Sequence, residues 1–218
     1  MTGLQISQLS YNQPNAPVAR DLSHPPFGGA VQHPTFYPVG AEIYAQGERC
    51  GSLYKVEFGA VRIYRLLSDG RRQISAFHLA GEVFGFEADH IHHFFAEAIC
   101  GTGIRTLPKK SSQGDLAIEL LPMALKGLVR AQEHLLVLGR QNAVERIAAF
   151  LVEMCERQGG LRQVDLPMSR TDIGDYLGLT IETVSRVFSK LKQKGIIRLP
   201  SLRNVEIVKW QTLQDMAT

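Results

Sequence analysis

Short stretches in which apolar and polar residues alternate occupy the chain from about residue 37 to residue 107. Three such runs follow one another, at residues 52–58, 61–66 and 73–77. A period of two predicts β-strands with one buried face, and Asp69-Gly70 between the second and third runs supplies the positive φ angles of a tight hairpin. The pattern therefore predicts a small antiparallel sandwich or barrel.

Beyond residue 113 the apolar positions are spaced alternately four and three residues apart, at Ala117, Leu121, Ala124, Leu128, Ala131, Leu135 and Leu138. This heptad spacing predicts a narrow apolar stripe on a long helix, and its small alanines favour close contact with a second helix. We expect a homodimer interface made by Leu121, Ala124, Leu128, Ala131, Leu135 and Leu138. The alternative is a helix that packs on its own domain. Because Pro122 cannot lie inside a straight helix, we expect it in the first turn, after a separate short helix.

A second helical pattern follows Gly139, where we expect the hinge between two domains. Asn142 is a suitable N-cap for it, because its side chain can accept hydrogen bonds from the first free N–H groups. The apolar stripe of this helix comprises Val144, Ile147, Ala148, Leu151, Met154 and Cys155. Cys155 is therefore expected to be a buried packing residue rather than a redox switch.

Residues 169–191 have the spacing of a helix-turn-helix. Gly178 can adopt the left-handed conformation of the turn, and Thr180 can cap the second helix. In that helix Val184, Val187, Phe188 and Leu191 form one apolar face, and the opposite stripe comprises Glu182, Ser185, Arg186 and Ser189. After Gly195, the runs 196–199 and 205–208 predict a hairpin, or wing.

The polar stripe has the chemistry of a DNA-reading helix. An arginine fork matches the two acceptors of guanine, a carboxylate accepts from the amino group of cytosine, and an apolar side chain contacts the methyl group of thymine. We expect Arg186, Glu182 and Ile181 to take these three roles, with Ser185 beside them. The alternative is that Glu182 and Arg186, four residues apart, only pair with each other. Contacts to the DNA backbone are expected from Thr180, Thr183, Ser189, Lys192, Arg198 and Arg203.

Composition and charge agree with this interpretation. The net charge is +3, and the basic excess lies after Gly139; residues 180–203 hold six basic side chains and only one acidic one, Glu182. A basic segment beside a neutral domain predicts a polyanionic partner, although a solvated helix face would give the same pattern. Residues 1–35 are rich in proline and predict a flexible arm. The three cysteines lie far apart, and the sequence predicts neither a membrane span nor an export signal, so we expect a cytoplasmic protein. We find no motif of a catalytic triad, a phosphate-binding loop or a metal hydrolase, so an enzyme is not expected.

The segment from Leu177 to Arg186, Leu-Gly-Leu-Thr-Ile-Glu-Thr-Val-Ser-Arg, closely resembles the recognition motif of the Crp/Fnr superfamily of bacterial transcription regulators, in its Fnr and FixK branch. The resemblance extends to residues 142–150 and to Gly81-Glu82. It implies an α+β fold with an N-terminal cyclic-nucleotide-type β-roll (36–112), a long dimerisation helix (113–139) and a C-terminal winged helix-turn-helix (140–218). It also implies a palindromic double-stranded DNA target such as TTGAT-N4-ATCAA, and a role in low-oxygen or nitrogen-fixation gene control.

The resemblance also indicates what the protein senses. Cyclic-nucleotide binders of the family hold the phosphate with an arginine after the Gly-Glu pair, but no Lys or Arg occurs here between Arg72 and Arg105. The arm has no cysteine for an iron–sulfur cluster. The chain is most similar to the FixK type, which implies an activator without a small-molecule effector, cofactor or metal. The alternative is a regulator that responds to a ligand, haem or metal, with His90, His92 and His93 as the metal ligands to consider. RNA polymerase is the further partner expected, at the hairpin residues Asp69, Arg71 and Arg72.

Overall fold

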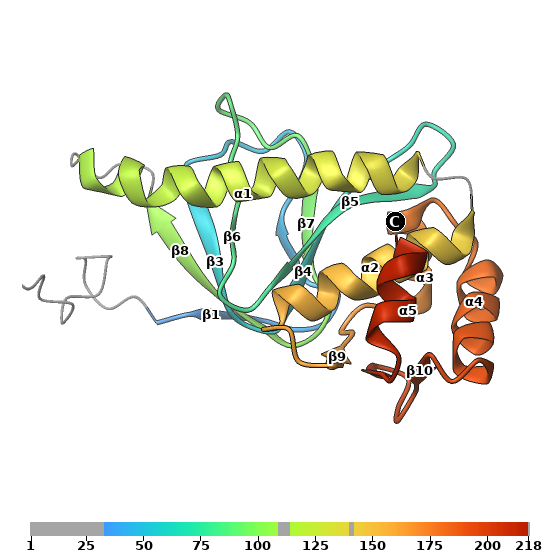
Figure 1. Cartoon of the computed structure of the whole chain (residues 1–218). Helices are drawn as coiled ribbons and strands as arrows, with labels where there is room; N and C mark the ends of the chain where they lie inside the picture. The colour runs from blue at the N-terminus through green and yellow to red at the C-terminus, as the bar shows by residue number, and fades with distance from the viewer. Residues whose placement is uncertain (1–32, 109–113, 140–141, 218) are drawn as a thin grey trace, which may run out of the picture. The chain divides into compact units, whose positions relative to one another are not determined.

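The chain folds into an α+β structure, described here by a computed structural model for residues 33–108, 114–139 and 142–217. The N-terminal part is a β domain, a long helix follows it, and the C-terminal part combines helices with a small sheet (Figure 1). The predicted fold class is therefore confirmed. Nearly all of the predicted arm, residues 1–32, lies outside the described residues.

Two four-stranded antiparallel sheets form the β domain. The first has the order β1-β8-β3-β6 and the second the order β2-β7-β4-β5. The strands are β1 (Thr35–Tyr37), β2 (Glu42–Tyr44), β3 (Ser52–Phe58), β4 (Ala60–Leu66), β5 (Arg72–Leu79), β6 (Val83–Phe84), β7 (Phe95–Ala98) and β8 (Thr102–Pro108). Alternate residues point inward, and Val56, Val61 and Ile104 meet in the core between the sheets. The three alternating runs in the sequence thus correspond to β3, β4 and β5.

A bulge in β5 gives this domain a second apolar face. Ile63 pairs with Ala76 and Tyr64 pairs with Ile74, so Ser75 is the extra residue on β5. The bulge places Ile74 and Phe77, three residues apart, in one buried cluster with residues of the C-terminal domain. The two domains therefore share apolar contacts.

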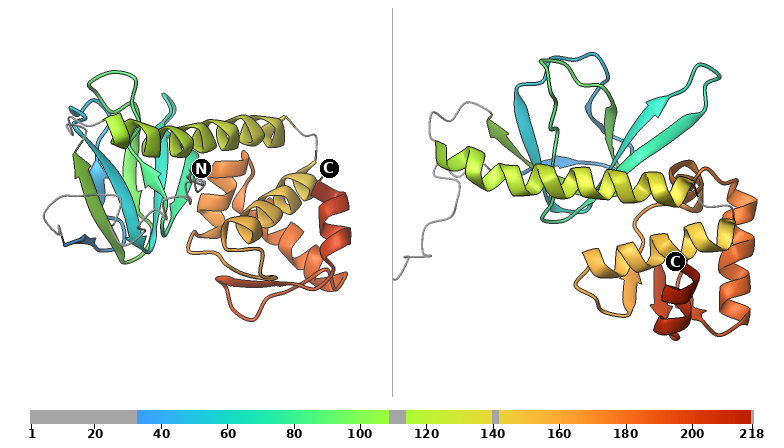
Figure 2. Two further views of the ribbon diagram at one scale, coloured as in Figure 1. Left: turned by 60° about the vertical axis from the view of Figure 1, so that its left-hand side comes forward. Right: turned by 45° about the horizontal axis from the view of Figure 1, so that its top comes forward.

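Helix α1 (Gly114–Leu138) follows residues 109–113 and is continuous. The prediction of a separate short helix before Pro122 is wrong, because Pro122 lies inside α1. Proline removes one backbone hydrogen bond, the one to the carbonyl group of Ile118. Both residues are at exposed positions, so water can reach that carbonyl group and lower the cost. Figure 2 shows α1 from two further directions as one unbroken helix.

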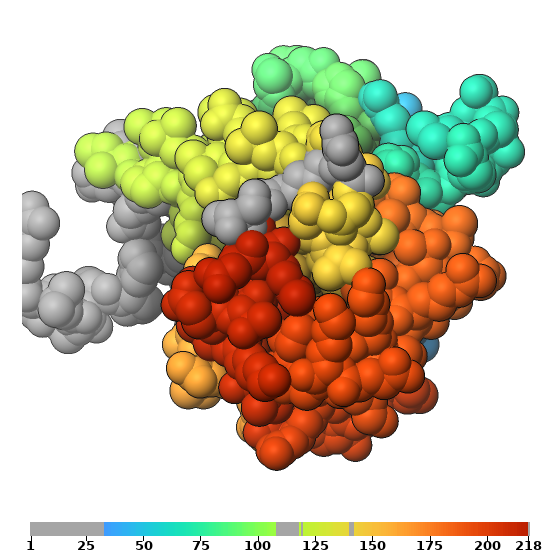
Figure 3. All heavy atoms as spheres, turned by 45° about the vertical axis from the view of Figure 1, so that its right-hand side comes forward, coloured from blue at the N-terminus to red at the C-terminus, as the bar shows by residue number. Residues whose placement is uncertain are grey.

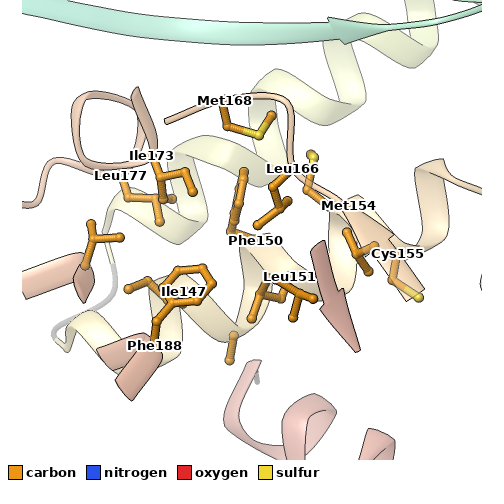
Figure 4. Close-up of a cluster of buried hydrophobic side chains, with 14 of the residues drawn as sticks. Ile147, Phe150, Leu151, Met154, Cys155, Leu166, Met168, Ile173, Leu177 and Phe188 are labelled. Carbon is orange, nitrogen blue, oxygen red and sulfur yellow. The ribbon is translucent and has the colours of Figure 1, made fainter. Parts of the chain in front are cut away.

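The C-terminal domain is built around α2 (Ala143–Arg157). Asn142 caps it as predicted, since its side chain accepts hydrogen bonds from the N–H groups of Val144 and Glu145. Phe150, Leu151 and Cys155 of α2 lie in a buried cluster that also takes residues of α3 and α4, among them Ile173, Leu177 and Phe188 (Figure 4). Cys155 is fully buried, as expected of a packing residue. The remaining elements are β9 (Gln163–Asp165), α3 (Arg170–Leu177), α4 (Ile181–Gln193), β10 (Ile197–Arg198), β11 (Asn204–Ile207) and α5 (Trp210–Ala217).

None of the helices in the described ranges is long and apolar enough to cross a membrane.

Candidate nucleic-acid interface

Helices α3 and α4 are joined by a tight turn. Gly178 adopts the left-handed conformation, with φ 64° and ψ 40°, and Thr180 caps α4 by accepting a hydrogen bond from the N–H group of Thr183, as predicted. Ser169 and Asp172 form a reciprocal capping box at the start of α3. The Ser-x-x-Asp spacing is a sequence signal for this box that the pattern analysis missed. Both helix starts are therefore fixed by local hydrogen bonds.

The turn also depends on Gly174, which sequence reasoning missed. A Cβ atom added to Gly174 would lie 2.6 Å from the carbonyl oxygen of Leu179, and the N–H group of Leu179 donates to the carbonyl oxygen of Gly174. The close contact is with backbone, which cannot move aside as a flexible side chain can. The turn thus allows no side chain at this position.

Gly174→Ala is expected to lower the free energy of unfolding by about 1–3 kcal/mol, because the methyl group must separate α3 from the turn. Urea unfolding of the full chain measures this. Gly127→Ala is the matched control: Gly127 lies inside α1 with nothing within 4 Å of its added Cβ, so alanine there should raise helix stability by up to about 1 kcal/mol. Equal effects of the two substitutions would contradict the prediction.

The two faces of α4 differ as the sequence predicts. Val184, Val187, Phe188 and Leu191 are buried. Glu182, Ser185, Arg186 and Ser189 are exposed, as is Ile181 at the start of the helix. Thr183 is half-buried, and its hydroxyl oxygen lies 3.2 Å from that of Thr180. One face thus anchors the helix while the other is open to a partner.

Glu182 is held as a carboxylate on this open face. Hydrogen bonds from its own backbone N–H group and from the hydroxyl group of Thr180 lower its pKa, and the charge of Arg186 adds a smaller contribution. The main causes therefore lie in the N-terminal turn of α4, whose free N–H groups favour a negative charge. Pairing with Arg186, the alternative left open by the sequence, is a secondary effect.

Arg170, at the start of α3, is a further basic residue near this surface. Its guanidinium group stacks on the ring of Phe188, 3.3 Å from the ring centroid. Within the described residues its Nη1 atom is buried without a hydrogen-bond partner. Burial lowers its pKa to about 10, so it stays charged at neutral pH. Among the described residues Arg170 thus makes a cation–π contact, which the sequence pattern does not predict.

The predicted wing is present, formed by β10 and β11, and β9 extends it to a three-stranded sheet. Arg198 and Arg203 are both exposed, and so is Lys192 at the end of α4. Arg198 lies 3.3 Å from Glu206 across the hairpin. An exposed ion pair of this kind is weak, so it can exchange for a phosphate.

On α1, the predicted stripe lies at the surface. Leu121, Leu128 and Leu135 are 58%, 55% and 68% exposed. Ala131 is exposed too, whereas Ala124 and Leu138 are half-buried. The opposite side of α1 faces its own chain, where Met123, Gly127 and Arg130 line a cavity together with β5 and β6 residues. Three large leucines on one face of α1 are therefore exposed among the residues that the structure describes.

The three predicted polymerase-contact residues of the β4–β5 hairpin lie in two different environments. Asp69 and Arg71 pair with each other at the exposed tip. Arg72 departs from the expectation of an exposed side chain, because its guanidinium group binds Asp172 and Asp175 of α3. In the space-filling view of Figure 3 the teal atoms of the hairpin adjoin the orange atoms of the C-terminal domain.

The Gly-Glu pair at residues 81–82 is engaged by the chain itself. The carboxylate of Glu82 binds Arg130 of α1 and Arg157 of α2, each at 2.8 Å. Burial alone would raise the pKa of Glu82, but the charge and hydrogen bonds of Arg157 outweigh it and lower the pKa. Beside this carboxylate is a cavity of about 220 Å³ lined in part by Lys126 and Arg130. Helix α1 therefore supplies the cations that the 73–104 segment lacks.

Two histidines of the 90–93 segment contact one carboxylate, that of Glu87: Nδ1 of His92 lies 3.3 Å from Oε1, and Nδ1 of His93 lies 2.8 Å from Oε2, while His90 is exposed. His92 is buried, with its ring stacked 3.6 Å from that of Tyr44. Across the described ranges, no group of three or more His, Cys, Asp or Glu side chains is placed to hold a metal ion.

In comparisons with known proteins, the β domain and the C-terminal domain each match a family model. A family model described as a Crp-like helix-turn-helix domain matches residues 145–216, and one described as a cyclic nucleotide-binding domain matches residues 34–100. The nitrogen fixation regulation protein FixK of Rhizobium meliloti (strain 1021) is 55% identical over 204 residues, which cover 94% of this chain and 96% of that protein. FixK of Azorhizobium caulinodans is 41% identical over 187 residues, 81% of this chain and 75% of that protein. The solved structure of FixK2 from Bradyrhizobium japonicum superposes with a TM-score of 0.80 at 44% identity and covers 84% of this chain and 96% of that chain.

Proposed function

The chain belongs to the Crp/Fnr family of DNA-binding transcription regulators, not to a family of enzymes, and we propose that it is a FixK-like activator of genes for nitrogen fixation or low-oxygen growth. The names of the two FixK relatives support the physiological role. The observation that carries the molecular role is the exposed stripe of Glu182, Ser185 and Arg186 on a capped helix whose other face is buried.

In this proposal α4 enters the major groove of each half-site of a TTGAT-N4-ATCAA-like palindrome. Arg186 donates two hydrogen bonds to the guanine, Glu182 accepts from the cytosine of the opposite strand, and Ile181 contacts a thymine methyl group. Ser185 lies between Glu182 and Arg186 on the same stripe. The lowered pKa of Glu182 supports its part, because both oxygens of an ionised carboxylate can accept a hydrogen bond from the amino group of cytosine.

The phosphate contacts surround this stripe. The reading residues are flanked by Thr180, Thr183 and Ser189. Basic side chains extend the contact along the end of α4 and the wing, at Lys192, Arg198 and Arg203. These groups supply affinity and register, whereas the α4 stripe supplies sequence preference.

We propose that two copies associate through the leucine stripe of α1, since a palindrome requires two reading helices about 34 Å apart. The interface residues are Leu121, Ala124, Leu128, Ala131, Leu135 and Leu138. The exposure of the three large leucines supports this, because contiguous apolar surface on a soluble protein marks a contact site.

Activity without an effector is part of the proposal. Glu82 is already neutralised by Arg130 and Arg157, so the family's Gly-Glu pair is occupied by side chains of α1 and α2. In this view the activity is set by the amount of the protein or by covalent change.

Fluorescence anisotropy on the TTGAT-N4-ATCAA duplex and a scrambled duplex, at one fixed salt concentration and with and without cyclic AMP, tests these points. We expect ligand-independent binding with a preference for the palindrome of about 10³-fold or more. Equal affinity for the two duplexes would refute the base assignments. Binding that requires cyclic AMP would refute independence from an effector.

A ligand-responsive regulator is the second candidate. The observation that favours it is the cavity of about 220 Å³ beside α1, where Lys126 and Arg130 could face an anionic ligand. Cyclic AMP is the first such ligand to test. Analysis of the purified protein for bound haem and metal tests the other two forms of this alternative.

The exposed pair Asp69 and Arg71 at the hairpin tip is proposed as the RNA polymerase contact. Substitution of either residue should reduce transcription from the target promoter while DNA binding stays normal. Arg72 does not share this role, because its guanidinium group is bound to α3.

A further inference from the structure

A cluster of ion pairs joins the β domain to α3. Arg62 of β4 and Arg72 of β5 both bind Oδ1 of Asp172, through Nη1 at 2.8 Å and Nη2 at 2.6 Å. Arg72 also donates from Nε and Nη2 to Oδ2 of Asp175, at 3.0 and 2.8 Å. Glu97 of β7 pairs with Arg62 from the other side. We call Arg62, Arg72, Glu97, Asp172 and Asp175 the Arg–Asp cluster.

The Arg–Asp cluster is largely removed from water. The side chain of Asp172 is 4% exposed, that of Arg62 is 15% exposed, and that of Arg72 is 22% exposed. Charges in such surroundings are tolerated only when their hydrogen bonds are made, and the planar guanidinium fork makes them in fixed directions. The cluster therefore favours one orientation of α3 on the β domain.

The remaining contacts of α3 with the β domain and α1 are one hydrogen bond and a set of ring contacts. Gln73 of β5 donates from Nε2 to the backbone carbonyl oxygen of Asp175 at 2.8 Å. The ring of Tyr176 lies 5.1 Å from that of Phe77 and 3.8 Å from that of His134. Such apolar contacts stabilise the association but are mostly non-directional, so they tolerate a small rotation. The ion pairs, together with the Gln73 hydrogen bond, are thus the directional part of the junction, and they fix its angle.

A change in the orientation of α3 must also move α4. The hydrogen bond from Leu179 to Gly174 closes the turn between them, and Arg170 of α3 stacks on Phe188 of α4. The two helices therefore move as a unit. In the orientation that the cluster holds, Glu182 and Arg186 are fully available to a partner.

We propose that Arg62 and Arg72 are positioning residues for DNA binding, which hold α3, and through it α4, in the orientation that reads DNA. Fixed charges of the β domain then do what a bound ligand does in a ligand-responsive regulator. This inference rests on the proposed function.

Asp175→Asn is the sharpest test. Removing a negative charge from a DNA-binding domain should strengthen DNA binding by electrostatics alone. The Arg–Asp cluster requires the opposite, a loss of operator affinity on the order of tenfold. Asp175 is chosen rather than Asp172, because Asp172 also caps α3 and its loss would weaken the helix itself.

Arg72→Gln should cause a loss at least as large, because Arg72 also binds Asp172. The double variant Arg72→Gln/Asp175→Asn should lose little more than Arg72→Gln alone, because the ion pair of Asp175 is made with Arg72. Arg72→Lys should recover part of the affinity. The slope of log affinity against log salt should stay at the wild-type value, whereas loss of a phosphate contact would reduce it by about one. Arg65→Gln is the matched control: Arg65 is an exposed arginine on β4 that contacts His93 and Phe94, and its loss should leave DNA binding unchanged.

Hydrogen exchange of residues 170–177 provides a readout without DNA, and exchange should be faster in Arg72→Gln than in wild type or Arg65→Gln. Tighter or unchanged operator binding by Asp175→Asn and Arg72→Gln would overturn the inference, as would a reduced salt slope. If wild-type protein does not prefer the palindrome, the proposed function fails, and hydrogen exchange then decides on the cluster alone: unchanged exchange in Arg72→Gln overturns it, and faster exchange supports it.

Discussion

Replacing Arg186 by alanine is expected to weaken the preference for the G·C pair in each half-site. The side chain is exposed on the open face of α4, one turn after Glu182 and opposite the buried Val184 and Phe188. A bidentate arginine–guanine contact is worth about 1–3 kcal/mol of discrimination. A dimer on two half-sites makes the contact twice, so operator affinity should fall by roughly 30-fold to 10⁴-fold.

Anisotropy on two duplexes measures this effect: the TTGAT palindrome and the same duplex with the guanine of both half-sites changed to adenine. Wild type should bind the changed duplex weakly, and Arg186→Ala should show a smaller difference, limited to what Glu182 contributes through the cytosine of the same base pair. Lys192→Ala is the control, because Lys192 is exposed at the end of α4 and is assigned to phosphate. It should weaken both duplexes by the same factor and reduce the salt slope. Discrimination in Arg186→Ala as strong as in wild type would show that another residue reads the guanine.

The local parts of this interface could be predicted from the sequence because their signals are local. Gly178 adopts the left-handed conformation because it has no side chain, and the hydroxyl group of Thr180 caps α4. The two faces of α4 follow from the 3.6-residue period of a helix. Strands β3, β4 and β5 of the β domain follow from alternation in the same way. Pro122 shows the limit of such rules, because its cost inside a helix depends on solvent exposure that the sequence does not give.

Contacts between distant segments could not be predicted. Arg72 and Asp175 are 103 residues apart, and nothing near either one indicates the other. Arg72 was therefore assigned to an exposed turn on the strength of its neighbours Asp69 and Gly70. The ion pairs of Glu82 could not be predicted either, because their arginines lie on α1 and α2, far along the chain. The segment where the family motif would place a cation contains none.

Replacing Leu128 by aspartate is expected to dissociate the proposed dimer. Leu128 is 55% exposed near the middle of the α1 stripe, on the side away from the residues that face its own chain. Burying one leucine side chain stabilises an interface by about 1.5–3 kcal/mol, and an unpaired carboxylate in its place adds a further cost. Each dimer carries the change twice, so the dissociation constant should rise by about 10³-fold or more. Each chain should stay folded.

Sedimentation velocity gives the mass in solution, and anisotropy on the palindrome gives the functional consequence. Leu161→Asp is the matched control, since Leu161 is an exposed leucine in the turn after α2 and the same chemical change there should leave the dimer intact. A monomer can occupy only one half-site, so Leu128→Asp should lose the benefit of simultaneous binding to two half-sites, even though every base-reading residue is present. A Leu128→Asp protein that remains dimeric and binds the palindrome normally would place the dimer contact elsewhere. The reading helix and the leucine stripe are therefore two separate requirements: Arg186→Ala tests which base is recognised, and Leu128→Asp tests whether two recognition events are joined.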